Sequence, residues 1–202
     1  MSGCLKPLLC LVAIAAGYWL WPVSELRHAP GILVATDPRQ SLISPKSLPA
    51  RAGFNLSAVA EYQLTARVLH SKRYWSGPSS DLVPVDLALG WGAMSDQAVL
   101  DRLEISQTNR FFFYEWQGAA PLDPLVMQSH ASNVHVIAAD DVVASVVSAL
   151  HQGELVAMRG YLVNASTLDG GYWKTSLSRT DTGNGACELF YVTGINVVEA
   201  AF

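Results

Sequence analysis

Cysteine is scarce in this sequence, which excludes one source of stability. Cys4 and Cys10 fall in an apolar N-terminal stretch, and Cys187 stands alone in the rest of the chain. A lone cysteine has no partner for an internal disulfide, so the core must supply the stability. Cys187 follows Ala186 at the predicted start of a strand, where a cysteine is more typically a small apolar filler than a nucleophile.

Basic residues are also few, and this argues against nucleic-acid binding. The chain has 13 Lys and Arg against 17 Asp and Glu, and only Lys6 lies among the first 23 residues. The remainder therefore has a net charge of −5. Non-specific nucleic-acid binding needs clustered Lys and Arg to replace counterions. We expect no nucleic-acid partner. We also expect that the domain itself does not bind an anionic bilayer surface.

Motifs that fix an activity are missing as well. Serine, histidine and aspartate all occur, but no G-x-S-x-G places a nucleophile between a strand and a helix. The glycine-rich stretch near the C-terminus does not have the spacing of a phosphate-binding P-loop. These absences favour a protein that is not an enzyme.

One long uncharged run is present at the N-terminus. The 18 residues Pro7–Ser24 carry no charge, which is near the lower limit for a helix that crosses a bilayer. Its end is too bulky for signal-peptide cleavage, and Tyr18, Trp19 and Trp21 resemble the aromatic belt of a membrane interface. We predict that residues 1–23 form a transmembrane signal anchor. The alternative is an apolar helix buried in the domain.

This anchor sets a location. The chain would contact the membrane through residues 7–23 as a single-pass protein. The positive residues that orient such a span are nearly balanced, with Lys6 before it and Arg27 and Arg39 after it. Because a short tail usually stays inside, we expect an inner-membrane protein with its C-terminal domain outside the cytoplasm.

The next segment is rich in proline. Residues 24–52 contain Pro30, Pro38, Pro45 and Pro49. Proline removes backbone donors and restricts its neighbour, so we predict an extended tether with at most one short strand, at residues 32–35. A single globular, β-rich domain would then occupy residues 53–202.

Strands dominate the predicted domain. Apolar residues occupy the even positions from Phe54 to Val68 and polar residues most odd ones, which indicates a strand with one buried face. Further strands are predicted at residues 83–89, 110–116, 154–165, 172–178 and 188–198. Asp169-Gly170-Gly171 predicts a hairpin turn between two of them.

Two short helices complete the pattern. Ser95 is the predicted cap of a helix over residues 96–103. Asp140 or Asp141 would cap a second helix, whose valines from Val142 to Val147 follow helical spacing.

These elements predict an α+β, β-rich fold after the N-terminal transmembrane helix. We expect either a small, partly closed barrel of the OB-like kind or a twisted antiparallel sheet with two short helices. Gly160, inside a predicted strand, marks a bend or bulge of the kind with which barrels turn corners.

Four blocks of sequence carry a resemblance to a known family. They are PVDLALGWGAMSD (residues 84–96), ISQTNRFFFYEW (105–116), SHASNVHVIAADD (129–141) and SLSRTDTGNGACEL (176–189). With these blocks the chain resembles an uncharacterised bacterial family of short proteins with one N-terminal apolar segment. The resemblance implies no activity and no catalytic residue.

His130 and His135 are the first candidate site. Imidazole is a preferred ligand of zinc, which needs three or four converging ligands. The two rings are five residues apart, so they point to opposite faces on a strand and about 140° apart on a helix. They could share a divalent metal only if residues 131–134 form a loop. The alternative is that one ring bonds to backbone while the other is exposed. We predict no cofactor and keep the metal as an alternative.

A second polar cluster precedes the last strand. Ser176, Ser178, Arg179 and Asp181 lead into Gly183 and Gly185, where backbone N–H groups could face an anion. The more ordinary interpretation is a loop held by an Arg179–Asp181 pair.

The aromatic run is two-sided. Alternation places Phe111 and Phe113 on one face and Phe112, Tyr114 and Trp116 on the other. Either a helix covers the second face, or aromatic surface is left for a partner or a glycan.

Two hypotheses of function follow. The first is a membrane-anchored binding or assembly module of the bacterial cell envelope with a protein partner. Its site would lie where residues 129–135 meet residues 176–185, and its binding residues would be Ser129, Asn133, Ser176, Ser178 and Arg179. The second is an envelope hydrolase or metal-dependent enzyme, with His130, His135 and Asp181 as catalytic candidates.

Overall fold

The computed structural model describes residues 25–77, 79–181, 183 and 185–200. The predicted anchor at residues 1–23 lies outside the described residues. Within the part of the chain that is described, no helix is both long and apolar enough to span a membrane.

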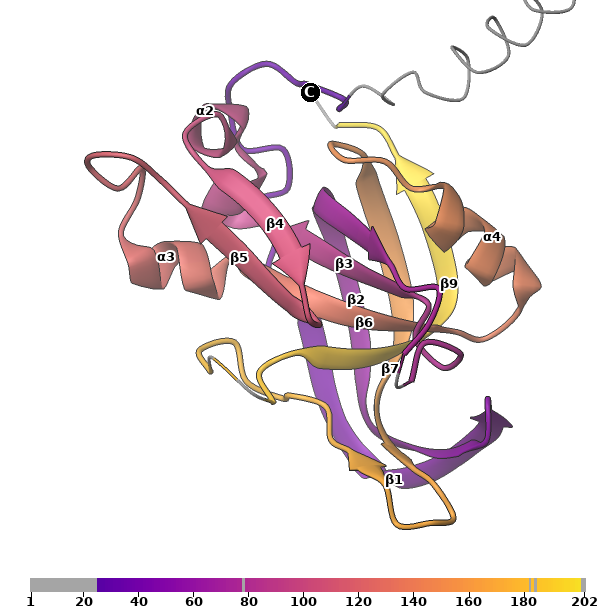
Figure 1. Ribbon diagram of the computed structural model, residues 1–202. Helices are drawn as coiled ribbons and strands as arrows, with labels where there is room; N and C mark the ends of the chain where they lie inside the picture. Colours follow the sequence, from indigo (N-terminus) through magenta and orange to yellow (C-terminus); the bar gives the residue numbers. More distant parts are fainter. Residues whose placement is uncertain (1–24, 78, 182, 184, 201–202) are drawn as a thin grey trace, which may run out of the picture.

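Nine strands and three short α-helices follow one another along the described chain (Figure 1). The strands are β1 (Arg39–Arg51), β2 (Phe54–Arg73), β3 (Val85–Gly90), β4 (Glu104–Thr108), β5 (Phe111–Glu115), β6 (Ala131–Ala138), β7 (Leu155–Ser166), β8 (Tyr172–Trp173) and β9 (Glu188–Val198). The helices are α2 (Gln97–Leu100), α3 (Pro124–Ser129) and α4 (Asp141–Ala149), with a 3-10 turn, η1, at Gly92–Ser95.

Seven strands form one mixed sheet in the order β1-β2-β3-β6-β9-β7-β8. The long strand β2 also pairs with β7, so β2, β3, β6, β9 and β7 close into a ring. This confirms the β-rich fold. The expectation of an antiparallel sheet was wrong in one respect, because β6 and β9 run parallel.

The alternation predicted for β2 is confirmed by its burial. Leu56, Ala58, Ala60, Tyr62, Leu64, Ala66 and Val68 are all buried. Most of these side chains belong to the main core cluster inside the ring, which also receives Val143 and Val147 from α4. Helix α4 packs against β6 and β9, and Asp140 caps it by accepting a hydrogen bond from the N–H of Val143, as the sequence indicated.

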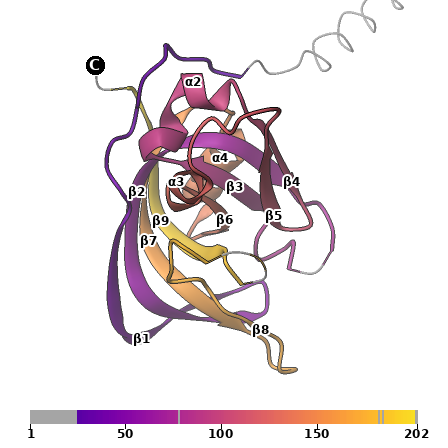
Figure 2. The same ribbon diagram turned by 90° about the vertical axis from the view of Figure 1, so that its left-hand side faces the viewer.

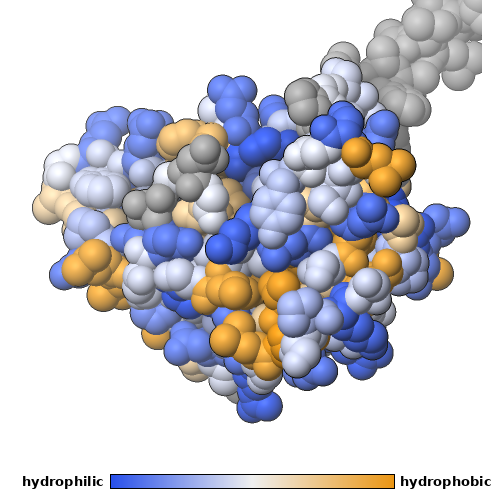
Figure 3. All heavy atoms as spheres, turned by 90° about the horizontal axis from the view of Figure 1, so that it is seen from below, coloured by the Kyte–Doolittle hydropathy of each residue, from blue (hydrophilic) through white to orange (hydrophobic). Residues whose placement is uncertain are grey.

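A second apolar cluster lies outside the ring. It includes Leu82, Ile137 and Leu189, with Ile43 and Leu48 of β1 packed against it. Figure 3, the view from below, shows hydrophobic side chains gathered in the middle of that face and bordered by hydrophilic ones.

The segment after residue 24 differs from the predicted tether. Residues 39–51 form β1, which pairs with β2 despite Pro45 and Pro49, and no strand occurs at residues 32–35. An edge strand tolerates proline because one row of its N–H groups has no ladder partner. β1 has a described partner on one side only, which explains how the prolines fit there.

Residues 25–34 are docked on the domain by hydrogen bonds. The guanidinium of Arg67, which is fully buried, donates to the carbonyl of Leu26 at 3.4 Å and to that of Ser95 at 3.2 Å. The hydroxyl of Ser95 accepts from the N–H groups of Leu33 and Val34, each at 3.1 Å. This segment and the C-terminal end of β9 lie at the same end of the molecule, away from β1 and β8 (Figures 1 and 2).

Ser95 is therefore not the helix cap that the sequence predicted. Asp96 caps α2 by accepting from the N–H of Ala98, and the helix is shorter than expected. The predicted return strand at residues 172–178 is also shorter, because β8 ends at Trp173. Strand β4 and helix α3 were not predicted.

Candidate functional site

The two polar stretches singled out in the sequence lie side by side. Ser132 of the first and Arg179 of the second both donate hydrogen bonds to the carboxylate of Glu188. Gln128, at the end of α3, donates to the carbonyl of Thr180 at 2.8 Å. The stretches thus meet around a residue that the sequence analysis did not select.

Glu188 is the buried acidic group of this region, with 1 % of its surface exposed. Burial raises the pKa of its carboxyl group above the ordinary value, while the Arg179 guanidinium and the Ser132 hydroxyl act in the opposite direction. The loop is therefore not held by the predicted Arg179–Asp181 pair. Asp181 instead accepts from the Ser176 hydroxyl at 2.7 Å.

Arg179 also connects this region to the core and to β1. Its guanidinium lies 4.9 Å from the ring centre of Tyr62, and it donates to the side-chain oxygen of Gln40. Burial is the main cause that raises the pKa of Tyr62. Arg179 thus joins the loop, β1, β2 and β9 at one point.

A cleft of about 310 Å³ opens beside this network. Its walls come from β5 (Phe111, Phe112, Phe113, Tyr114), from α3 and the start of β6 (Gln128, Ala131, Ser132, Asn133), and from the segment that leads into β9 (Ser178, Arg179, Asp181, Gly183, Ala186, Cys187, Glu188). Its volume is at the lower end of the range for ligand pockets.

The two faces of the aromatic run have different surroundings. Phe112 and Tyr114 pack against a third apolar cluster, which includes Met94 of η1 and Met127 of α3. Phe113 of the other face is 43 % exposed and lines the cleft. The first face thus packs on the domain, where Met127 is the contribution of α3, and Phe113 leaves aromatic surface open on the other.

Strand β5 presents an unpaired edge to this cleft. Among the described strands it pairs only with β4. Asn109 and Arg110 join the two strands with φ values of 51° and 70°, as in a two-residue type I′ turn. In such a hairpin the flanking residues form a hydrogen-bonded pair, so the N–H and C=O groups of Phe112 and Tyr114 point away from β4.

His130 and His135 do not converge. His130 ends α3, and its Nδ1 lies 2.8 Å from the carbonyl oxygen of Val126. His135 lies in β6, and its Nδ1 is 2.8 Å from the carboxylate of Asp86. Outside residues 1–24, 78, 182, 184 and 201–202, no group of three or more His, Cys, Asp or Glu side chains is arranged to hold a metal ion.

Asp86 is a buried carboxylate that the sequence analysis missed. It is fully buried in β3 and also accepts from the Arg110 guanidinium at 2.9 Å. The ring of Trp173 lies 4.8 Å from that of His135. An aspartate within the apolar run PVDLALG was the available signal, because a buried charge needs a partner elsewhere in the fold.

The other binding candidates have structural partners. Ser129 donates back to the carbonyl of Val126 within α3, and the Ser176 hydroxyl accepts from the N–H of Ser178. Asn133 donates to the carbonyl of Arg110 at 2.9 Å and so fixes the turn between β4 and β5.

Cys187 lines the cleft without the features of a nucleophile. Burial raises the pKa of its thiol to about 11, which leaves little thiolate near neutral pH. Through its described residues the cleft offers hydrogen-bonding groups and aromatic surface, and its thiol is not activated. Comparisons with protein-family models, curated proteins and solved structures found no match to this chain.

Proposed function

We propose that this protein is a binding module that takes an extended peptide segment of a protein partner into the cleft beside β5. The observation that carries the proposal is the unpaired edge of β5. It forms one wall of a cleft whose other wall is polar. Free backbone groups on a strand edge recognise a peptide by adding it as a further strand.

The side chains around the cleft suit this mode of binding. Phe113 supplies exposed apolar surface, on which a side chain of the added segment can pack. Gln128 and Asp181 supply polar groups on the opposite wall. Main-chain hydrogen bonds would give affinity, and these side chains would give selectivity.

We place this module in the bacterial cell envelope, anchored through residues 7–23 with the domain outside the cytoplasm. The uncharged run with its aromatic end supports this placement. The strand ring would be a small OB-like barrel, because the β2–β7 pairing closes the sheet and Gly160 sits at a register shift between β7 and β9.

The hydrolase alternative is less well supported. It needs His130, His135 and Asp181 to act on one substrate, but each contacts a different partner. The Asp86–His135 pair is buried, and the Arg110 guanidinium already occupies the same carboxylate oxygen.

Amide hydrogen exchange tests the proposal directly. Peptides selected from a random decapeptide library would be bound to the full chain in detergent micelles. In the free protein the amides of Phe112 and Tyr114 should exchange faster than those of Phe111 and Phe113. Bound peptide should slow the first pair and leave the second pair unchanged.

Phe113→Ser provides the matched variant, and Val142→Ser provides the control. Both replace an exposed apolar side chain, but Val142 lies on α4 and does not line the cleft. We expect weaker peptide binding only for Phe113→Ser. Peptides that bind both variants equally, without protecting Phe112 and Tyr114, would contradict the proposal.

A further inference from the structure

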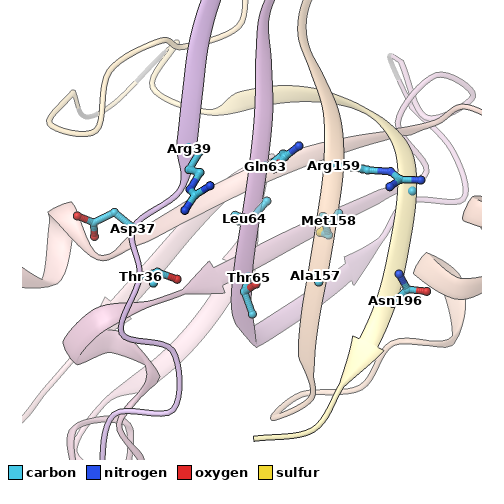
Figure 4. A pocket seen from close by; sticks show the side chains of 11 residues that line it. Thr36, Asp37, Arg39, Gln63, Leu64, Thr65, Ala157, Met158, Arg159 and Asn196 are labelled. Carbon is cyan, nitrogen blue, oxygen red and sulfur yellow. The ribbon is translucent and has the colours of Figure 1, made fainter. Parts of the chain in front are cut away.

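A second hollow lies on the outer face of the sheet, away from the cleft. Its volume is about 410 Å³, and β1, β2, β7 and β9 contribute to it (Figure 4). The strand register places Arg39, Gln63, Arg159 and Gly194 in one row across these four strands. The backbones of the two arginines are therefore separated by two strand spacings, about 10 Å.

The next row of residues across these strands has short side chains, so it leaves the groove open. Thr65, Ala157 and Asn196 form the next row. At Gly194 a Cβ atom would lie 2.8 Å from the Nε of Arg159, so the arginine lies across the glycine. A side chain at position 194 would displace the guanidinium from the sheet face.

Both guanidinium groups are free to meet a ligand. Arg39 and Arg159 are exposed, and neither side chain has an ion pair or hydrogen bond to another described residue. Figure 4 shows them on the same face, with Gln63 between them. Thr65 and Asn196, which also line the groove, add neutral hydrogen-bonding groups near the two arginines.

We infer that this groove binds an acidic oligosaccharide, a chain of uronic acid sugars. Each guanidinium would pair with one carboxylate, for which its planar donor geometry is suited. Alternate carboxylates of a β-1,4-linked uronic acid chain point to the same side, as two spaced arginines require. Gln63, Thr65 and Asn196 would bond to hydroxyl groups between them.

Other anionic polymers fit this groove less well. Among the described residues no aromatic side chain lines it, whereas single-stranded nucleic acid is held by stacking on aromatic rings. Asp37 borders the groove and would repel an anion at that end, which leaves the two arginines as the anchoring points.

Calorimetric titration tests this inference. A hexamer of β-1,4-linked mannuronic acid would be titrated into the full chain in detergent micelles. Arg39→Gln and Arg159→Gln should each weaken binding about 3- to 10-fold, and the double variant should abolish it. Added salt should weaken binding by the wild-type protein. Arg73→Gln, which removes an exposed arginine outside the groove, should bind as the wild type does.

The neutral mannose hexamer separates charge recognition from general sugar binding and should not bind. Retained binding in the double variant, equal binding of the neutral hexamer, or no binding of the acidic hexamer would each overturn the inference. Tighter binding of an oligothymidylate would also overturn it, in favour of a nucleic acid. Phe113→Ser should leave this titration unchanged, so the outcome is independent of the proposed peptide cleft.

Discussion

The carboxylate of Asp86 lies 2.8 Å from Nδ1 of His135, and the two residues face each other in the register of β3 and β6. Arg110 reaches the same carboxylate oxygen from the turn between β4 and β5. One buried side chain thus connects two strands of the large sheet with the separate β4–β5 hairpin that forms a wall of the cleft.

Asp86→Ala should therefore destabilise the fold by about 3–5 kcal/mol, because it leaves the guanidinium of Arg110 without its buried partner. Urea denaturation measures the free energy of unfolding. Asp81→Ala is the control, since Asp81 is exposed. If the two variants unfold within about 1 kcal/mol of each other, the connecting role of Asp86 is wrong.

The stability of the protein should depend on the protonation of Glu188. Its pKa in the folded state is raised, so the folded state binds a proton more readily than the unfolded state. The free energy of unfolding should then fall as the pH rises from the ordinary glutamate value of 4.5 through the raised folded value. Glu188→Gln should flatten this part of the profile in denaturation experiments. An unchanged profile in the variant would assign the dependence to other groups.

Cys187 should react slowly in the folded protein. With a pKa of about 11 instead of 9.0, its thiolate fraction at pH 8 is about 100-fold lower than in the unfolded chain. Iodoacetamide alkylation followed by mass spectrometry measures this rate in a variant that carries Cys4→Ser and Cys10→Ser. Equal rates with and without urea would show that the thiol is not shielded.

Gly160→Ala should cost about 2–4 kcal/mol of stability, because a Cβ atom there would lie 2.0 Å from the carbonyl oxygen of Tyr191. Gly53→Ala is the matched control. Gly53 has a φ of 80°, and no atom lies within 4 Å of the place that a Cβ would take, so only backbone strain of about 1–2 kcal/mol is expected. Thermal or urea unfolding compares the two, and similar losses would argue against the close contact at Gly160.

Alternating burial explains why β2 could be predicted from the sequence. From Leu56 to Ala66 of β2 the even positions are buried and the odd positions are more exposed, so the pattern is visible. Strand β6 was not predicted, because Asn133, His135 and Ile137 are as buried on one face as Val134 and Val136 are on the other. Polar residues that satisfy each other across the fold leave no periodic signal.

The candidate site was predicted only in its outline. Ser132 and Arg179 belong to the two stretches selected from their polar composition, and they meet at Glu188. In the sequence Glu188 is simply the first residue of an apolar strand, and Asp86 is an exception within another. Arg179 is 9 residues from Glu188 in sequence, and His135 is 49 residues from Asp86. Only the folded chain identifies these partners.

The hydrogen bonds at Leu26, Leu33 and Val34 have a mechanical consequence for an anchored protein. If residues 7–23 cross a bilayer, only a residue or two separates the span from the first docked position. The domain would then be held directly at the membrane surface, because no flexible linker would separate it from the span. Its reach would be limited to partners beside the lipid surface, and the end of the molecule that carries β1 and β8 would point away from it (Figure 1).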